Sequence, residues 1–264
     1  MGVADLYSKR LAGYFGRSFE MKRWMVVTVE TQIEWPAEET TIEFMGRLLV
    51  LRPPAGDSAA DLRLQYEYPE GEQKAVETIC RFLSTLSWHH RRPARGRYRI
   101  SCTAPMRGGS RGFGPPLCKE FELSPDLKTP PDPKARVALA LYREALSVDN
   151  TPYEFLGYFK VINICYHTGK DQKDWINRTL PLLTDKRARQ RIAELTASER
   201  DIGAYLYASG RCAVAHASLG SCVVDPDNPE DVLRLSADMP VARALAEYLI
   251  EIELGVPWEF SKST

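Results

Sequence analysis

The spacing of hydrophobic residues changes once along the chain, near residue 130, and this change constrains the fold most. Before it, apolar and polar residues mostly alternate, which is typical of half-buried β-strands. Beyond it, apolar residues recur every three or four positions, which indicates amphipathic helices. Strands followed by a run of helices favour an α+β protein over an alternating α/β fold.

The first part of the chain contains three alternating segments, one helical segment and a further strand. The alternating apolar sets are Val27, Val29, Ile33 and Trp35; Ile42, Phe44, Leu48 and Val50; and Leu62, Leu64, Tyr66 and Tyr68. A helix is predicted over about 72–88, and a short strand follows with Tyr98, Ile100 and Cys102 on one face. This order predicts a small antiparallel sheet with one helix on its apolar face.

A proline-rich segment separates the two parts. Residues 123–134 read LSPDLKTPPDPK and hold few large apolar groups, which is typical of a linker. We therefore expect an N-terminal β-rich module over 1–130 and a helical bundle over 131–264. In the bundle, a helix beginning near Pro133 is expected first, followed by helices over about 153–167, 171–183, 185–197, 199–217 and 239–254, with a loop over 218–237.

Composition narrows the classes of protein. The 35 basic and 35 acidic side chains cancel, so any electrostatic argument must be local. No apolar run approaches the roughly 18 residues of a membrane span, and no signal peptide is evident. The six cysteines form no C-x-x-C pair, so we expect reduced, mostly buried thiols and no metal site. These features predict a cytoplasmic protein with no membrane partner.

Common catalytic motifs do not assign a function to this chain. Residues 108–112 match G-x-S-x-G literally, but a nucleophile elbow requires a helix directly afterwards. Phe113-Gly114-Pro115-Pro116 follows instead, and such a sequence does not start a helix. No Walker loop or dinucleotide-binding fingerprint is present.

An arginine-rich stretch extends from Thr78 to Lys119 without one acidic residue. Guanidinium groups bind phosphates bidentately, and the aromatic residues interleaved with them can stack on bases. The stretch is therefore a candidate nucleic-acid-binding surface, and the alternative is a solvated arginine-rich edge. The candidate binding residues are Arg91, Arg92, Arg95, Arg97, Arg99, Arg107 and Arg111.

A second candidate site lies late in the helical part, where Arg211 and His216 form an R-x4-H motif. Small apolar residues fill the gap between them, and small residues allow two helices to approach closely. Residues five apart on a regular helix lie about 140° apart, so the two side chains share a face only if the helix deviates. Gly210, directly before Arg211, is a position where such a bend is possible.

A late R-x4-H motif within a compact helical bundle resembles the HEPN superfamily. More narrowly, TPYEFLGYFKVIN followed by GRCAVAHA is similar to HEPN-like proteins of the methylamine utilisation MauJ type and to HEPN domains of phage-defence proteins. The resemblance covers about residues 133–255. It implies an all-α HEPN-like bundle, a homodimer that brings two motifs into one cleft, and a role in defence or stress response.

The resemblance also implies an activity, metal-independent RNA cleavage. Arg211 would hold the scissile phosphate, and His216 would move a proton to or from the 2′-hydroxyl or the leaving oxygen. The RNA would supply its own nucleophile, so no metal or cofactor is required. One departure stands out: active members commonly carry a polar residue after the arginine, and this chain has Cys212.

Two alternatives remain open from the sequence. In one, the protein is a non-catalytic dimeric scaffold or an RNA- or ligand-binding module in which Arg211 and His216 are structural. In the other, it is a toxin-like module controlled by an inhibitory or activating protein partner. An enzyme predicts an Arg-His pair that faces solvent, whereas a scaffold predicts a pair that is buried and hydrogen-bonded.

Overall fold

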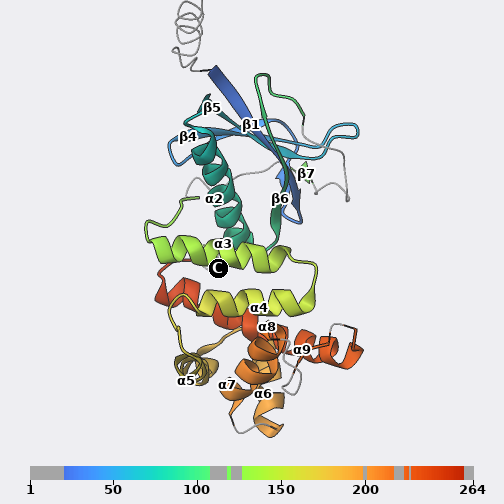
Figure 1. The fold of residues 1–264 in the computed structure, drawn as a ribbon, viewed down its shortest axis with the longest axis vertical. Helices are drawn as coiled ribbons and strands as arrows, with labels where there is room; N and C mark the ends of the chain where they lie inside the picture. Colours follow the sequence, from blue (N-terminus) through green and yellow to red (C-terminus); the bar gives the residue numbers. More distant parts are fainter. Residues whose placement is uncertain are drawn as a thin grey trace, which may run out of the picture.

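The computed structural model describes residues 21–107, 118–119, 127–198, 201–216, 223–225 and 227–258. A five-stranded antiparallel sheet with one long helix is followed by a helical region, which confirms the predicted α+β class (Figure 1). Arg111 and the G-x-S-x-G segment lie outside the described residues.

The sheet has the strand order β3-β4-β5-β1-β6. Its strands are β1 (Met21–Thr31), β3 (Thr40–Phe44), β4 (Arg47–Arg52), β5 (Asp61–Tyr68) and β6 (Ala94–Cys102), and α2 (Glu72–His90) packs on one face. Two short strands, β2 (Trp35–Pro36) and β7 (Cys118–Lys119), pair separately in parallel. The predicted alternation over 62–68 is confirmed, because Leu62 and Leu64 are fully buried in the core under α2.

The segment 42–50 is a hairpin and not one alternating strand. Met45 and Gly46 form its turn, both with positive φ, at 53° and 68°. Glycine adopts this conformation without strain, and Met45 is exposed at the turn. The turn shifts the alternation by one residue, so Leu49 is buried while Leu48 is 63% exposed.

The edge strand β6 also departs from the prediction. Tyr98 and Ile100 are exposed, so they do not form part of the apolar face under α2. The pairing of β1 with β6 shifts register between Val27 and Val29, and such a bulge reverses which residues face the core. Gly96 lies opposite Val29 and contacts Val27 and Leu83 on the core side.

The helical region holds seven α-helices among the described residues. They are α3 (Pro133–Ser147), α4 (Thr151–Ile162), α5 (Gly169–Thr179), α6 (Lys186–Ser198), α7 (Ile202–Tyr205), α8 (Ala213–Ala215) and α9 (Pro229–Tyr248). The region also holds the 3₁₀ turn η1 (Leu180–Leu182) and two π-helices, η2 (Leu206–Cys212) between α7 and α8 and η3 (Leu249–Glu253) after α9. Asp132 and Asn150 cap α3 and α4 by accepting backbone N–H bonds, each followed by a proline in the first turn.

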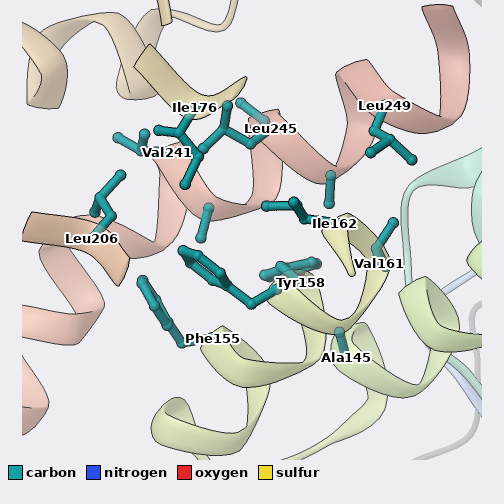
Figure 2. Packing of buried hydrophobic residues seen from close by; sticks show 14 of the residues in the cluster. Ala145, Phe155, Tyr158, Val161, Ile162, Ile176, Leu206, Val241, Leu245 and Leu249 are labelled. Atoms are coloured by element: carbon teal, nitrogen blue, oxygen red, sulfur yellow. The ribbon is translucent and has the colours of Figure 1, made fainter. Parts of the chain in front are cut away.

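Helix α4 forms the centre of the helical core. Phe155, Tyr158 and Ile162 are fully buried and pack against side chains from α5, η2 and α9 (Figure 2). Its Gly157 lies against Ala145 of α3, where an added Cβ would come within 2.7 Å of the alanine Cβ. An apolar helix buried on most sides is therefore in the position that its sequence predicted.

Two predicted helix bounds are wrong. Helix α4 ends at Ile162 and not near His167, because the chain tightens into i→i+3 bonds at Ile164 and Cys165. Gly169 begins α5. Helix α9 begins at Pro229, inside the segment expected to be a loop, where Asn228 caps it.

Buried apolar residues gather in two clusters. One lies between the sheet and α2, and the other lies among the helices and includes Trp88 from the end of α2. The four cysteines with described side chains are free but only partly buried, which corrects the expectation of mostly buried thiols. They are Cys80, Cys102, Cys165 and Cys212.

Candidate functional site

The R-x4-H motif begins on a widened helical turn. The segment η2 is a π-helix, and the backbone N–H of Ala213 reaches back to the carbonyl of Ala208, five residues earlier. The helix then ends, and His216 leaves it in an extended conformation, with φ −126° and ψ 125°. On a regular helix the two side chains would point about 140° apart, but the helix ends at Ala215, so His216 is not held at helical spacing from Arg211.

The two side chains of the motif are in contact. Nη1 of Arg211 lies 3.4 Å from Nε2 of His216 and 3.7 Å from Sγ of Cys212. Arginine only donates hydrogen bonds, so a hydrogen bond in this contact requires Nε2 of His216 as the acceptor. His216 is exposed and Arg211 is half-buried. The pair is therefore oriented toward solvent rather than sealed in the core.

Tyr207 is a member of this site that the sequence analysis missed. The Arg211 guanidinium lies 5.5 Å from the centre of the Tyr207 ring, and Nζ of Lys173 lies 6.0 Å from it. Burial and a hydrogen bond with Cys212 raise the pKa of Tyr207 above its ordinary value, so its hydroxyl stays protonated. Tyr207 precedes Arg211 by one helical turn, and this spacing is the signal that could have found it.

Gly210 sets the position of the motif by close packing rather than by a bend of its own. A Cβ at this position would lie 2.4 Å from Cε1 of Phe155 in α4. Glycine therefore lets η2 press on the central helix, and Arg211 follows directly from that contact.

The arginine-rich stretch is divided among several environments. Arg95 lies 4.0 Å from Glu30 in an ion pair, and Arg97 also bonds to Glu30. Arg107 donates to the carbonyl of Pro53, and the exposed Arg92 and Arg99 form no ion pair with any residue that the structure describes. Part of the positive charge of this stretch is therefore exposed at the surface around β6, without an ion-pair partner among the described residues.

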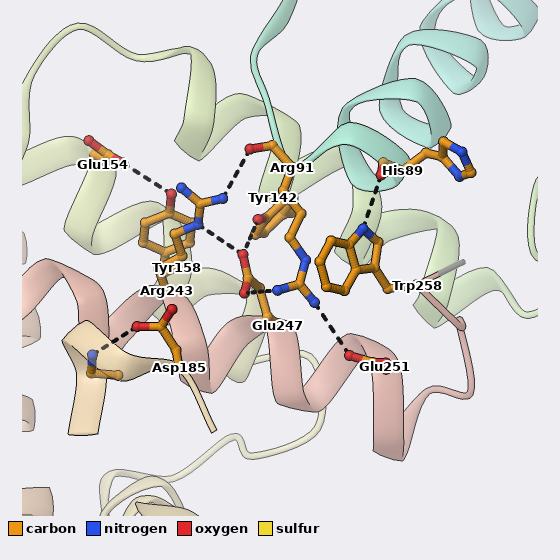
Figure 3. Close-up of polar contacts among 11 residues, drawn as sticks. His89, Arg91, Tyr142, Glu154, Tyr158, Asp185, Arg243, Glu247, Glu251 and Trp258 are labelled. Carbon is orange, nitrogen blue, oxygen red and sulfur yellow. Dashed lines mark hydrogen bonds and ion pairs between the residues drawn. The ribbon is translucent and has the colours of Figure 1, made fainter. Parts of the chain in front are cut away.

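Arg91 is not at that edge. It turns inward from the end of α2 and bonds to Glu247 at 2.7 Å and Glu251 at 3.4 Å (Figure 3). Its guanidinium stacks on Trp258 at 3.7 Å, and the indole N–H of Trp258 donates to the carbonyl of His89. Arg91 therefore fastens the N-terminal module to the helical region.

Glu247 is the centre of this junction network. Besides Arg91 it accepts bonds from the Tyr142 hydroxyl and from Nε of Arg243, the latter at 2.8 Å. Burial, followed by the charge of Glu247, raises the pKa of Tyr142 well above its ordinary value, so the phenol remains a donor. The carboxylate is compensated by two cations and one hydroxyl, as a buried charge requires.

No group of three or more His, Cys, Asp or Glu side chains suited to a metal ion occurs in the described residues. Likewise, no helix in the described part of the chain is long and apolar enough to cross a membrane.

These observations define a mixed α+β protein whose helical C-terminal region presents an Arg-His pair on a π turn. Residues 138–251, a little under half of the chain, match the family model described as Methylamine utilization protein MauJ. The match includes Arg211, His216, Arg243 and Glu247, so this region is MauJ-like. No curated protein and no solved structure gives a significant match.

Proposed function

We propose that the protein is a metal-independent endoribonuclease that acts through Arg211 and His216. The observation that carries this proposal is the 3.4 Å contact between the guanidinium and the imidazole, with His216 exposed. A cation beside a neutral imidazole is the pair needed to bind a phosphodiester and accept a proton. The likeness of this motif to HEPN proteins supports the same activity.

The chemistry uses groups that the chain already supplies. Arg211 binds a non-bridging phosphate oxygen and stabilises the charge that develops during the reaction. His216 takes the proton of the RNA 2′-hydroxyl, which attacks the adjacent phosphorus and expels the 5′-oxygen, and this oxygen takes up a proton from water. The products carry a 2′,3′-cyclic phosphate and a 5′-hydroxyl, and DNA is not cleaved because it lacks the nucleophile.

The available arginines around β6 extend this proposal to substrate selection. Arg92, Arg99 and Arg107, with the Glu30-paired Arg95 and Arg97, would contact the RNA backbone outside the cleavage site. We further propose that the enzyme acts as a homodimer, with defence or stress response as its context and an inhibitory or activating protein partner as its control.

A non-catalytic scaffold is the second candidate, and one observation favours it. Arg211 and His216 bond to each other within one chain, and Arg211 also contacts Cys212, so the pair has structural partners without any RNA. In that case the N-terminal arginines would bind RNA or another anionic ligand without cleavage.

Cleavage of a mixed RNA pool in the presence of EDTA tests the proposal. The parent chain should cut RNA and leave cyclic-phosphate ends, His216→Ala should not, and His167→Ala is the matched control, because His167 is also exposed but lies outside the motif. Cleavage by His216→Ala at the parental rate would overturn the assignment. Absence of cleavage by the parent, together with retention of RNA in an electrophoretic shift, would support the scaffold.

A further inference from the structure

A pocket of about 630 Å³ opens beside the junction network. Its walls come from the end of α2, from α4, from the start of α6 and from α9, so both parts of the chain contribute. Its volume is in the range that holds small organic ligands. The R-x4-H motif does not line it.

Arg243 is held rigidly at the wall of this pocket. Its Nε bonds to Glu247 at 2.8 Å, and its Nη2 donates to the carbonyl of Arg91 at 3.0 Å (Figure 3). Its Nη1 forms no hydrogen bond with any residue in the described part of the chain. A guanidinium fixed at two nitrogens with the third available is oriented in advance for an anion, so little conformational entropy is lost on binding.

The start of α6 adds two more cations. Lys186 and Arg187 line the same pocket, are exposed, and have no ion pair among the described residues. Asp185 beside them is occupied as the cap of α6, because its carboxylate accepts the backbone N–H of Ala188 at 2.8 Å.

The acidic groups of the pocket do not cancel these cations. Glu247 is already compensated by Arg91 and Arg243. Burial raises the pKa of Glu154 above its ordinary value, despite the bond that the Tyr158 hydroxyl donates to it, so its negative charge is disfavoured. The remaining wall is apolar, with Met239, Pro240 and Ala244.

We propose that this pocket is a binding site for a small organic anion. A phosphate or carboxylate group would lie between Nη1 of Arg243, Lys186 and Arg187, and the apolar part of the ligand would lie over Met239 and Ala244. Arg243 also bonds to the Arg91 carbonyl, so the bound anion would strengthen the attachment of the N-terminal module to the helices.

Isothermal titration of the full chain with inorganic phosphate, adenosine monophosphate and glutarate tests this site, with uncharged adenosine as the negative probe. At least one anion should bind at micromolar to low millimolar concentration, and the probe that binds tells phosphate from carboxylate recognition. If no anion binds, or if adenosine binds as well as adenosine monophosphate, the proposal is wrong.

Substitutions in the pocket test where the anion binds. The double variant Lys186→Gln/Arg187→Gln should weaken binding by about tenfold or more, because it removes two surface cations without disturbing the buried network. Arg189→Gln is the matched control, since Arg189 is exposed on the same helix but does not line the pocket. Equal affinity in the double variant and the parent would overturn the proposal. His216→Ala should bind as the parent does, which separates this site from RNA cleavage.

Discussion

Two arginine-centred clusters contact the central helix α4, and they differ in how their charges are compensated. At the junction, Glu247 receives Arg91, Arg243 and the Tyr142 hydroxyl, and its side chain is only 10% exposed. At the π turn, Arg211 has an imidazole and a thiol as its hydrogen-bond partners among the described residues, and His216 is exposed.

The difference indicates two uses of arginine. A buried ion cluster whose groups satisfy one another stabilises one arrangement of the chain, and at the junction it leaves only Nη1 of Arg243 for an external phosphate. An arginine without a carboxylate, beside an exposed histidine, retains its capacity to bind one. Substitutions in the junction cluster should therefore mainly lower stability, and substitutions in the π-turn cluster should mainly lower activity.

Removing the central carboxylate should have the largest effect on stability. Glu247→Gln leaves Arg91 and Arg243 without their shared counter-ion, so the free energy of unfolding should fall by about 3 kcal/mol. Urea unfolding measures it. Glu251→Gln is the control, because its carboxylate is 30% exposed and such pairs contribute at most about 1 kcal/mol. Equal losses of unfolding free energy in the two variants would contradict the proposed difference between the clusters.

Filling the close contact between η2 and α4 should cause the second-largest loss of stability. Gly210→Ala places a methyl group against Phe155, and overpacking of this kind costs about 1–3 kcal/mol. The double variant Gly210→Ala/Phe155→Leu should recover part of the loss, because it removes the ring that the methyl group meets. Thermal unfolding of both variants checks this, and Ala208→Ser is a control at an exposed neighbouring position.

Removing the stacked indole should weaken the junction moderately. Trp258→Ala eliminates the ring over Arg91 and the bond to the His89 carbonyl, at a cost of roughly 1–2 kcal/mol. Limited proteolysis within residues 127–134 should become faster as the N-terminal module loosens. An unchanged cleavage rate would mean that Arg91 does not depend on Trp258.

Acidification should lower stability through His90, at the end of α2. Burial, and then the charge of His89, lowers the pKa of His90 to about 4 from an ordinary 6.5. Between these values the unfolded chain binds more protons, so stability should decrease as pH falls from about 6.5 to 4. Unfolding measured across this range should show a shallower slope for His90→Asn than for the parent. An identical slope would exclude His90 as its source.

The smallest effect on stability is expected at His216. His216→Ala removes an exposed side chain, so the free energy of unfolding should change by no more than about 0.5 kcal/mol. A loss comparable with that of Glu247→Gln would show that His216 is structural, and the contrast between the clusters would disappear.

Local patterns predicted the fold better than the sites. The alternation over Leu62–Tyr68 and the caps at Asp132 and Asn150 depend on neighbouring residues, so the sequence carries them directly. Alternation does not reveal the hairpin at Met45 because its turn shifts the pattern, and the loop-like composition around Asn228-Pro229 hides the start of α9.

The sites depend on contacts that no local pattern encodes. The motif at Arg211 is visible in the sequence, but its contact with His216 depends on the helix ending at Ala215, which periodicity does not predict. Arg91 was grouped with its arginine-rich neighbours, whereas its partner Glu247 lies 156 residues away in the chain. Glu247 itself falls between apolar positions of a helix and gives no sign of burial.

The most direct test measures stability and RNA cleavage together for His216→Ala and Trp258→Ala, with EDTA present. The account predicts that His216→Ala keeps the parental unfolding free energy and loses cleavage, while Trp258→Ala loses stability and, where still folded, retains cleavage. Parental cleavage by His216→Ala, or a parent chain that cuts no RNA, would contradict it.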